Sequence, residues 1–430
     1  MGLAVTIVFG MQWGDEGKGR TVDLLARDAD YVVRYSGGAN AGHTVVVGNE
    51  RYALRLVPSG ILYPDKWCFM GGGTAIDPLS LVAEMDGLIA RGVDFSHFRV
   101  SGSAHVVMPY HKLLERLDEE RLGKSRIGTT ATAQGPTYAD RSARWGITMW
   151  DLMEHDRLTQ RVESALQVKN AVFQHAFGQQ PLRTEDVVNE VWPAAERLRP
   201  YVAQIELTLA QAAKEGKRIL MEGAQGAFLD LGYGTYPYVT SSHPVPGGAC
   251  LGTGIGPRQI ERVIGVAKAY TSRVGAGPFP TEQDNETGEH LRERGHEYGT
   301  VTGRPRRCGW LDLVMLRTAA LINGVDALAV ARLDILDELD PLLVCTHYRC
   351  DGQDLRYVPS DIRVLERCQP VYEQLPGWRT STQEARHFSQ LPPPAEAYLD
   401  LIARETGTPI AVVGVGERRE QAIVQPGALA

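Results

Sequence analysis

The sequence lacks the cysteine patterns that hold a metal ion or a disulfide framework. Its six cysteines are scattered among 430 residues, and none of them forms a Cys-x-x-Cys pair. Isolated thiols of this kind are typical of core or surface residues in a reducing compartment. We therefore expect a cytoplasmic protein without structural zinc or disulfides.

Long apolar runs and a surplus of basic residues are absent as well. No run reaches the roughly 18 apolar residues that a membrane-spanning helix requires. The N-terminus has neither the basic flank nor the small-residue cleavage site of a signal peptide. The formal net charge is −7, whereas proteins that bind nucleic acids or membrane surfaces present a basic face. We expect small-molecule substrates, with no nucleic acid and no membrane as partners.

Internal repeats are also missing, but one local pattern recurs along the chain. Short apolar runs end in a glycine turn, as at Leu3 to Phe9, Arg218 to Gly223 and Val263 to Val274. Strand, turn and helix in succession indicate an α/β fold with a large, mostly parallel central sheet and flanking helices. The length of the chain is compatible with one large domain with subregions or with two domains.

Between these runs, the pattern changes from strand-like to helical. Apolar residues at helical spacing predict helices near 79–91 and 110–121, and a helical region over about 149–217 covers one flank of the sheet. Residues 283–300 are polar and punctuated by glycine, which predicts a mobile loop.

The densest motif is GMQWGDEGKGRTVD, from Gly10 to Asp23, directly behind the first apolar run. Its glycines let the backbone approach a ligand closely, and the free N–H groups at the start of a helix attract an anion. Lys18 adds a positive charge at the same place. The motif predicts a phosphate-binding turn, although glycine alone would also fit a tight strand-to-helix connection.

The turn is not a standard Walker A loop. That pattern requires glycine where Gln12 stands and serine or threonine where Gly19 stands. Without a hydroxyl for magnesium, the nearest hard oxygen ligand in the turn is the carboxylate of Asp15 or of Glu16.

Other polar motifs follow later apolar runs, and each has two interpretations. His43, after Asn-Ala-Gly, is a turn residue or a catalyst, and Gln225 follows a second strand at the corresponding place. The arginines of TGRPRRC form a solvated turn or bind phosphates and carboxylates. Asp334 ends an apolar run, as in guanine-binding loops, where one carboxylate accepts both N–H groups of the base.

Together, these stretches resemble the adenylosuccinate synthetase family. The resemblance rests on WGDEGKG, GGANAGHT, GTT followed by GPTYAD, EGAQG, GTYPYVTSS, RVGAGPFPTE, TGRPRRCGWLD and the LD of ARLD, and it extends from about Val5 to Ile423. It implies a P-loop-like GTP-binding architecture in a single domain, residues 1–430, with helical and loop subregions near 100–217 and 275–310. It also implies GTP-dependent joining of L-aspartate to IMP through a 6-phosphoryl-IMP intermediate, for AMP biosynthesis, by a Mg²⁺-dependent homodimer.

The resemblance also implies a role for each matching residue. Asp15 is the general base and a magnesium ligand, His43 the general acid, and Lys18 and Gln225 support the phosphoryl group; the Gly42 carbonyl is the second metal ligand. The GTP-binding positions are Gly14, Glu16, Gly17, Lys18, Gly19, Arg20, Gly42, His43, Thr44, Arg306, Arg332, Leu333, Asp334, Gly414, Val415 and Gly416. The IMP-binding positions are Asp15, Asn40, Ala41, Thr130, Gln225, Thr240, Arg304 and, from a second subunit, Arg144. The aspartate-binding positions are Thr300, Val301, Thr302, Gly303 and Arg304.

Several positions depart from the family pattern, and most of them are ligand positions. Family lysines are replaced by Arg20 and Arg332, a glutamine by Ser36, a threonine by Val301, and a proline by Glu417; Ala131 to Gln134 replace Gly-Arg-Gly-Ile. The expected catalytic residues are unchanged. An alternative is therefore a paralogue that performs the same chemistry on a purine-like nucleotide analogue or with another amine. A catalytically silent nucleotide-binding protein and a plain GTP hydrolase are further alternatives, which strict IMP dependence of turnover would exclude.

Overall fold

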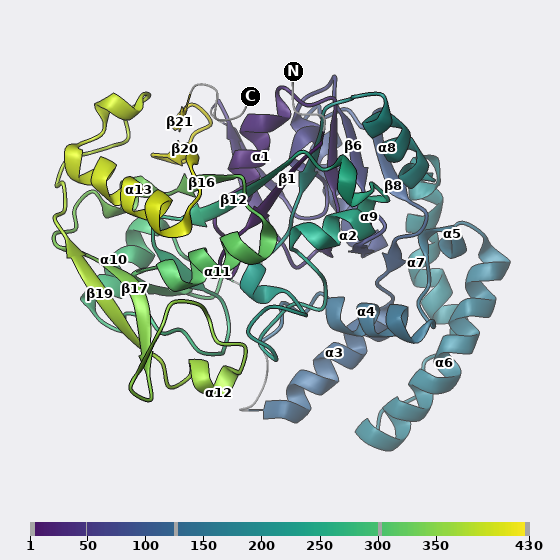
Figure 1. Cartoon of the computed structure of the whole chain (residues 1–430). Helices are drawn as coiled ribbons and strands as arrows, with labels where there is room; N and C mark the ends of the chain where they lie inside the picture. Colours follow the sequence, from purple (N-terminus) through teal and green to yellow (C-terminus); the bar gives the residue numbers. More distant parts are fainter. Residues whose placement is uncertain (1–4, 49, 124–127, 300–302, 426–430) are drawn as a thin grey trace.

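The computed structural model describes residues 5–48, 50–123, 128–299 and 303–425, and it is built around one large sheet (Figure 1). Nine adjacent strands of this sheet are parallel, and only the last pair, β20 and β21, is antiparallel. The predicted α/β class with a mostly parallel sheet is confirmed. In spatial order the strands are β10 (Val202–Ala203), β8 (Phe98–Ser101), β6 (Trp67–Met70), β2 (Tyr31–Arg34), β11 (Ile219–Glu222), β1 (Val5–Gly10), β12 (Arg262–Lys268), β16 (Ala327–Ala331), β20 (Ile410–Gly414) and β21 (Ala422–Val424).

Strand β1 lies in the middle of the sheet, and all six of its residues are buried. It pairs with β11 on one side, in the register Val5 to Ile219, and with β12 on the other. Ile7 and Phe9 face one hydrophobic core and Val8 faces the other, as the two-residue period of a strand requires. The aliphatic run therefore forms a strand because helices cover both of its faces.

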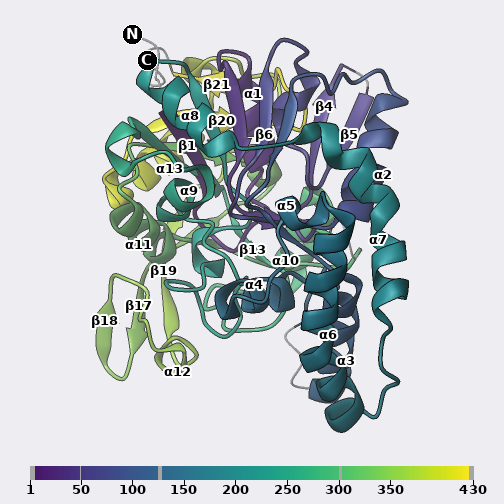
Figure 2. The same cartoon turned by 90° about the vertical axis from the view of Figure 1, so that its right-hand side faces the viewer.

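The two faces of the sheet are covered by different helices (Figure 2). The core on the Val8 side includes residues of α1 (Lys18–Ala26), α2 (Pro78–Ile89), α3 (Pro109–Leu122), α6 (His155–Phe177) and α7 (Thr184–Leu198). The core on the Ile7 side includes residues of α8 (Ile205–Lys214), α9 (Pro246–Thr253), α11 (Leu313–Asn323) and α13 (Pro393–Thr406). The helices predicted near 79–91 and 110–121 are thus α2 and α3, and the region 149–217 is largely helical as expected.

Helix α6 extends away from the sheet together with α3 and α4 (Gln134–Ala143). The short helix α5 (Met149–Leu152) lies at the end of α6 that is nearer the sheet. No helix of the described residues is long and apolar enough to cross a membrane.

Short strands surround the central sheet. One small sheet contains β3 (Gly37–Gly38), β7 (Thr74–Ile76) and β9 (His105–Val106). Two antiparallel pairs are the hairpin of β4 (His43–Val47) and β5 (Glu50–Leu54), and β13 (Thr271–Arg273) with β14 (Arg307–Gly309). A four-stranded sheet contains β15 (Leu311–Asp312), β17 (Leu342–Cys350), β18 (Gln353–Leu355) and β19 (Gln369–Leu375), and α12 (Ile362–Leu365) lies beside it.

Two sequence-based predictions need correction. The run from Val263 to Val274 is two strands, because β12 ends at Lys268 and the chain turns before β13 pairs with β14. The polar segment 283–300, predicted as a loop, contains helix α10 (Glu286–Gly295). Asn285 caps this helix through its side chain, and acidic residues in the first turn and basic residues in the last turn suit the helix dipole. The sequence did not predict this helix, because the segment has few apolar residues at helical spacing.

Candidate active site

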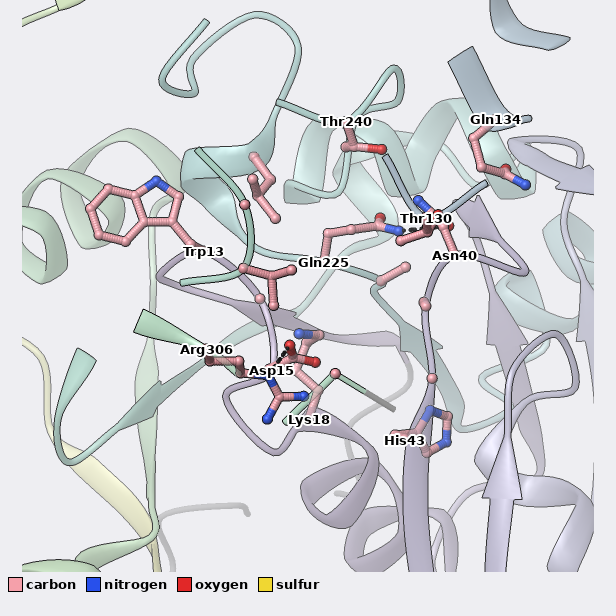
Figure 3. Close-up of a pocket in the computed structure, with 18 of the residues that line it drawn as sticks. Trp13, Asp15, Lys18, Asn40, His43, Thr130, Gln134, Gln225, Thr240 and Arg306 are labelled. Atoms are coloured by element: carbon pink, nitrogen blue, oxygen red, sulfur yellow. Dashed lines mark hydrogen bonds and ion pairs between the residues drawn. The ribbon is translucent and has the colours of Figure 1, made fainter. Parts of the chain in front are cut away.

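A cleft of about 710 Å³ lies at the carboxyl edge of the central sheet. Residues that end or follow β1, β11, β12 and β16 line it, together with residues from the β4–β5 hairpin and from the segment 128–136. Ligands of open α/β sheets bind at this edge, and the volume is in the range of small-molecule sites. Figure 3 shows side chains from these distant segments pointing toward one another.

The glycine-rich turn after β1 wraps the start of α1. Gly14, Asp15 and Gly17 have φ angles of 85°, 59° and 93°, in the left-handed region that only glycine adopts without cost. No side chain caps the N-terminus of α1 at Gly17. The free N–H groups and the helix dipole therefore face the cleft, where an anion would be stabilised.

The two carboxylates of this turn point in opposite directions. The Asp15 side chain lines the cleft and is 32% exposed, whereas that of Glu16 is fully buried. One Glu16 oxygen accepts hydrogen bonds from the N–H groups of Gln12 and Gly14, at 3.0 and 2.9 Å, and the other lies 2.6 Å from Lys18 Nζ. Of the two candidate oxygen ligands, Asp15 is thus the one that a ligand in the cleft can reach.

His43 faces Lys18 across the cleft from the start of β4. Its Nε2 lies 2.8 Å from Ser59 Oγ and 3.6 Å from Glu222 Oε1. Burial lowers the pKa of His43 although Glu222 opposes that shift, so the free protein holds a neutral imidazole near pH 7. A Cβ at Gly19 would lie 2.2 Å from His43 Cδ2, which explains the glycine there. Ser59 was missed by sequence reasoning, whereas Glu222 opens the motif EGAQG.

Several polar side chains lie around Gln225 at the other end of the cleft. The backbone of Gln225 has a φ of 50°. Its Nε2 donates to Asn40 Oδ1 at 3.0 Å (Figure 3). Its Oε1 is buried and finds no partner among the described residues. Thr130 and Thr240 line the same end of the cleft. A buried amide oxygen without a partner is costly, so this end is suited to a ligand that donates a hydrogen bond.

Arg306 reaches the cleft from the segment before β14. Its Nε lies 2.9 Å from Asp15 Oδ2 (Figure 3), and its Nη1 donates to Glu297 Oε2 at 2.7 Å. Burial disfavours the charge, but Asp15 and Glu297 outweigh that effect and raise the pKa of Arg306. The carboxylate expected to be the general base is thus next to a fixed cation.

The described site residues divide into two groups. Most of the predicted residues line the cleft: Gly14, Asp15, Gly17, Lys18, Gly19, Arg20, Asn40, Ala41, Gly42, His43, Thr44, Thr130, Gln225, Thr240, Arg306, Arg332 and Gly416. The others do not line it: Glu16, Arg144, Gly303, Arg304, Leu333, Asp334, Gly414 and Val415. Thr300, Val301 and Thr302 lie outside the described residues.

The sequence matches the adenylosuccinate synthetase family over residues 7–423. The chain belongs to that family. It is similar to the adenylosuccinate synthetases of Synechococcus sp. (strain WH7803), at 52% identity over 98% of this chain and 97% of that one, and of Gloeobacter violaceus, at 51% identity over 98% and 96%. Membership makes the chain a GTP-dependent ligase of purine nucleotide biosynthesis, as its motifs predict.

Solved structures agree with this assignment. Fully ligated adenylosuccinate synthetase from Plasmodium falciparum superposes with a TM-score of 0.93 at 35% identity, covering 98% of this chain and all of that one. The chain is also similar to the succinoaminodeoxyadenylate synthetase of cyanophage S-2L, bound to dGMP and dATP, with a TM-score of 0.60 at 21% identity. This match covers the whole of this chain and 97% of the cyanophage protein. That second likeness concerns the fold alone.

Two departures from the adenylosuccinate synthetase pattern contact each other. Arg332 Nη1 lies 3.5 Å from Glu417 Oε1, at the two positions where the resemblance implies lysine and proline. A third departure, Arg20, donates to the carbonyls of Gly416 and Gln421, next to Glu417. These three substitutions therefore form one connected change at the end of the cleft near Asp334, whose buried Oδ1 has no partner among the described residues.

Proposed function

We propose that this cleft joins IMP to L-aspartate at the expense of GTP, with Asp15 as the general base. The supporting observation is that Asp15 and His43, from two separate segments, face one cleft on either side of Lys18. A base and a proton donor around a bound phosphate are what transfer of the γ-phosphoryl group to IMP requires.

In the first step, Asp15 removes the N1 proton of the hypoxanthine, and O6 attacks the γ-phosphorus. The bond between phosphorus and the β,γ-bridging oxygen breaks, and the products are 6-phosphoryl-IMP and GDP. In the second step, the aspartate amine attacks C6 and phosphate leaves with the original O6. The amine gives up a proton, so atoms and charges balance.

His43 acts on the transferring phosphoryl group as a hydrogen-bond donor and general acid. Its lowered pKa leaves it neutral in the free protein. The negative charge of bound GTP favours the protonated imidazole, because an anion nearby stabilises the cation. Charge stabilisation of this kind is a major part of phosphoryl-transfer catalysis.

GTP would lie along the glycine-rich turn. Lys18 and the N–H groups of Gly14, Gly17 and Gly19 would hold its phosphates, with His43, Thr44 and Arg306 close by. Arg20, Arg332, Leu333, Asp334, Gly414, Val415 and Gly416 would surround the base, and the unpartnered Asp334 oxygen would accept guanine N–H groups. Glu16 would support the turn from behind, since its carboxylate is buried in hydrogen bonds with the turn itself.

The oxygen donors of the cleft fit Mg²⁺. Within the described residues, no group of three or more metal-binding side chains occurs, so protein carboxylates alone would not hold the ion. Mg²⁺ typically takes one or two carboxylates and completes its shell with substrate phosphates and water. Asp15 and the Gly42 carbonyl would hold it, and the bound ion would neutralise charge on the phosphates.

IMP would occupy the Gln225 end of the cleft. Asn40, Ala41, Thr130, Thr240 and Gln225 would contact it. Arg144 is exposed at the end of α4 and does not line its own cleft, which supports a contribution to the cleft of a second subunit in a cytoplasmic homodimer. Arg304 and the segment 300–303 would bind the aspartate carboxylates.

Isotope transfer tests the proposed intermediate. IMP labelled with ¹⁸O at C6 is incubated with GTP, Mg²⁺ and L-aspartate, and the phosphate released is analysed by mass spectrometry. We expect one ¹⁸O in each phosphate. Unlabelled phosphate formed together with adenylosuccinate would show that O6 is never phosphorylated and would exclude this mechanism.

A further inference from the structure

Four charged residues that line the cleft form a continuous row. Lys268 Nζ lies 2.5 Å from Glu297 Oε1, Arg306 Nη1 lies 2.7 Å from Glu297 Oε2, and Arg306 Nε lies 2.9 Å from Asp15 Oδ2. Lys268, Glu297 and Arg306 are 2%, 1% and 8% exposed. The charges alternate in sign and sum to zero, so each buried charge has a neighbour of opposite sign that offsets its loss of hydration.

Four separate segments supply this row, and Asp15 comes from the turn between β1 and α1. Lys268 ends β12, Glu297 follows α10, and Arg306 precedes β14. The backbone N–H of Arg306 also donates to the Glu297 carbonyl at 2.8 Å. Glu297 is therefore joined to Arg306 through both backbone and side chain.

Further polar contacts fix the Glu297 end of the row. Tyr270 OH donates to Glu297 Oε1, and Lys268 Nζ lies 2.6 Å from Ser272 Oγ. The backbone N–H of Lys268 donates to Gln12 Oε1 at 2.8 Å, so the row is also tied to the glycine-rich turn. Burial opposes ionisation of Glu297, but Lys268 and Arg306 outweigh it and lower its pKa to about 2. The carboxylate is thus a fixed negative charge.

Arg306 keeps donors for a ligand. Among the described residues, its Nη1 is hydrogen-bonded to Glu297, while its Nε lies close to Asp15 without a hydrogen bond of acceptable geometry and is otherwise buried without a partner. A guanidinium offers five N–H groups in a rigid plane. Fixing one edge of that plane on Glu297 therefore determines where the other edge points in the cleft.

We propose that Glu297 is the positioning residue that holds Arg306 against the cleft wall, with its free edge toward the phosphates of GTP, and that Lys268 balances the charge. The identity of the bound anion rests on the proposed function. Without the negative charge of Glu297, Lys268 and Arg306 would be two cations sharing one carboxylate, Asp15. Arg306 would then keep only its contact with Asp15, and its free edge would no longer be fixed toward the phosphates.

The test compares Glu297→Gln with the wild-type protein. A charge-assisted hydrogen bond contributes about 1.5 to 3 kcal/mol, so misplacing Arg306 is expected to raise the KM for GTP by roughly 10- to 100-fold. The KM for IMP should change less, because most of the IMP residues are at the other end of the cleft, although Asp15 lies beside Arg306. Glu297→Asp, which keeps the charge on a shorter side chain, should restore part of the loss.

Glu405→Gln is the matched control. Glu405 pairs with Arg317 at 2.7 Å, and Arg317 is 7% exposed, but neither residue lines the cleft. This variant also removes one carboxylate from a largely buried arginine, so it should reduce stability and leave the KM for GTP unchanged. An equal rise in both variants would show that loss of a buried ion pair acts through general stability and would refute the proposal.

A double-mutant cycle separates positioning from a general effect. If Glu297 acts through Arg306, then Glu297→Gln should add nothing to the GTP affinity lost in Arg306→Ala, measured by calorimetry. Independent, additive losses, or an unchanged affinity in folded Glu297→Gln and Glu297→Asp, would overturn the proposal. Since calorimetry measures GTP binding without turnover, it distinguishes this failure from failure of wild-type protein to form adenylosuccinate.

Discussion

Asp15 and Glu16 are neighbours in the sequence with opposite surroundings. The φ of 59° at Asp15 directs its side chain into the cleft, and Glu16 turns inward to satisfy N–H groups of its own turn. The sequence identified both as candidate oxygen ligands, but side-chain direction in an irregular turn depends on backbone angles that residue types do not specify. A buried carboxylate in the turn also explains how Lys18 is held in place, at 2.6 Å from Glu16.

Gly19→Ala should selectively damage the site. The added methyl group would lie 2.2 Å from His43 Cδ2, so the imidazole must shift from its position. Because a positioned acid or base supplies typically 10²- to 10⁴-fold in rate, we expect turnover to fall by about 10²-fold or more while the protein stays folded.

The control for this variant is Gly87→Ala in helix α2. A Cβ at Gly87 meets nothing within 4 Å, and alanine is favoured over glycine in a helix by about 0.5 to 1 kcal/mol. This change should raise the thermal midpoint slightly and leave turnover intact. If Gly19→Ala were as active as Gly87→Ala, the position of His43 would not matter for catalysis.

At the level of secondary structure, the strands of the central sheet were the most predictable elements. An aliphatic run such as β1, with every residue buried, has no other stable place than between two helical layers. Helix α10 was missed, because its sequence is almost entirely polar and only the Asn285 cap and the charge pattern mark it. It matters for function, since Glu297 directly follows its C-terminal turn.

Helix α11 provides a test of stability against pH. Its N-cap, Asp312, accepts hydrogen bonds from Met315 N and Tyr348 OH, and burial raises the pKa of Asp312 from 3.8 to about 6. The folded protein thus binds this proton more tightly than the unfolded chain. The contribution of Asp312 to stability is present at low pH and is lost as the pH rises from about 4 to about 6, by about 3 kcal/mol.

Asp312→Asn keeps a capping side chain but cannot ionise. The free energy of unfolding of Asp312→Asn in urea, measured relative to that of the wild type, should therefore increase between pH 4.5 and pH 7.5 by about 2 kcal/mol. An identical difference between the two proteins at both pH values would contradict the assigned ionisation of Asp312.

Over the whole molecule, the parallel sheet brings together residues separated by hundreds of positions. Asp15 and Gln225 follow the paired strands β1 and β11 of this sheet, whereas His43 opens the β4–β5 hairpin and Arg306 precedes β14, so packing of these smaller sheets against the central one completes the group. Resemblance to the family identified them because their motifs are long. The supporting residues Ser59, Lys268 and Glu297 belong to segments without a distinctive pattern, and their importance follows from tertiary contacts alone.

Tertiary contacts also connect three of the departures from the family pattern. Arg20, Arg332 and Glu417 come from three parts of the chain and meet at one end of the cleft. Their connection favours an adjusted GTP pocket over a lost one.

The most direct test of the account is adenylosuccinate formation by the purified protein, followed by absorbance and identified by mass, with wild type and Asp15→Asn in parallel. With GTP, Mg²⁺, IMP and L-aspartate, the wild type should turn over, and omission of any one substrate should stop both ligation and phosphate release. Asp15→Asn should lose about 10²- to 10⁴-fold in rate and still bind GTP. Near-normal turnover by Asp15→Asn, or wild-type activity only with another nucleotide or amine, would contradict the account.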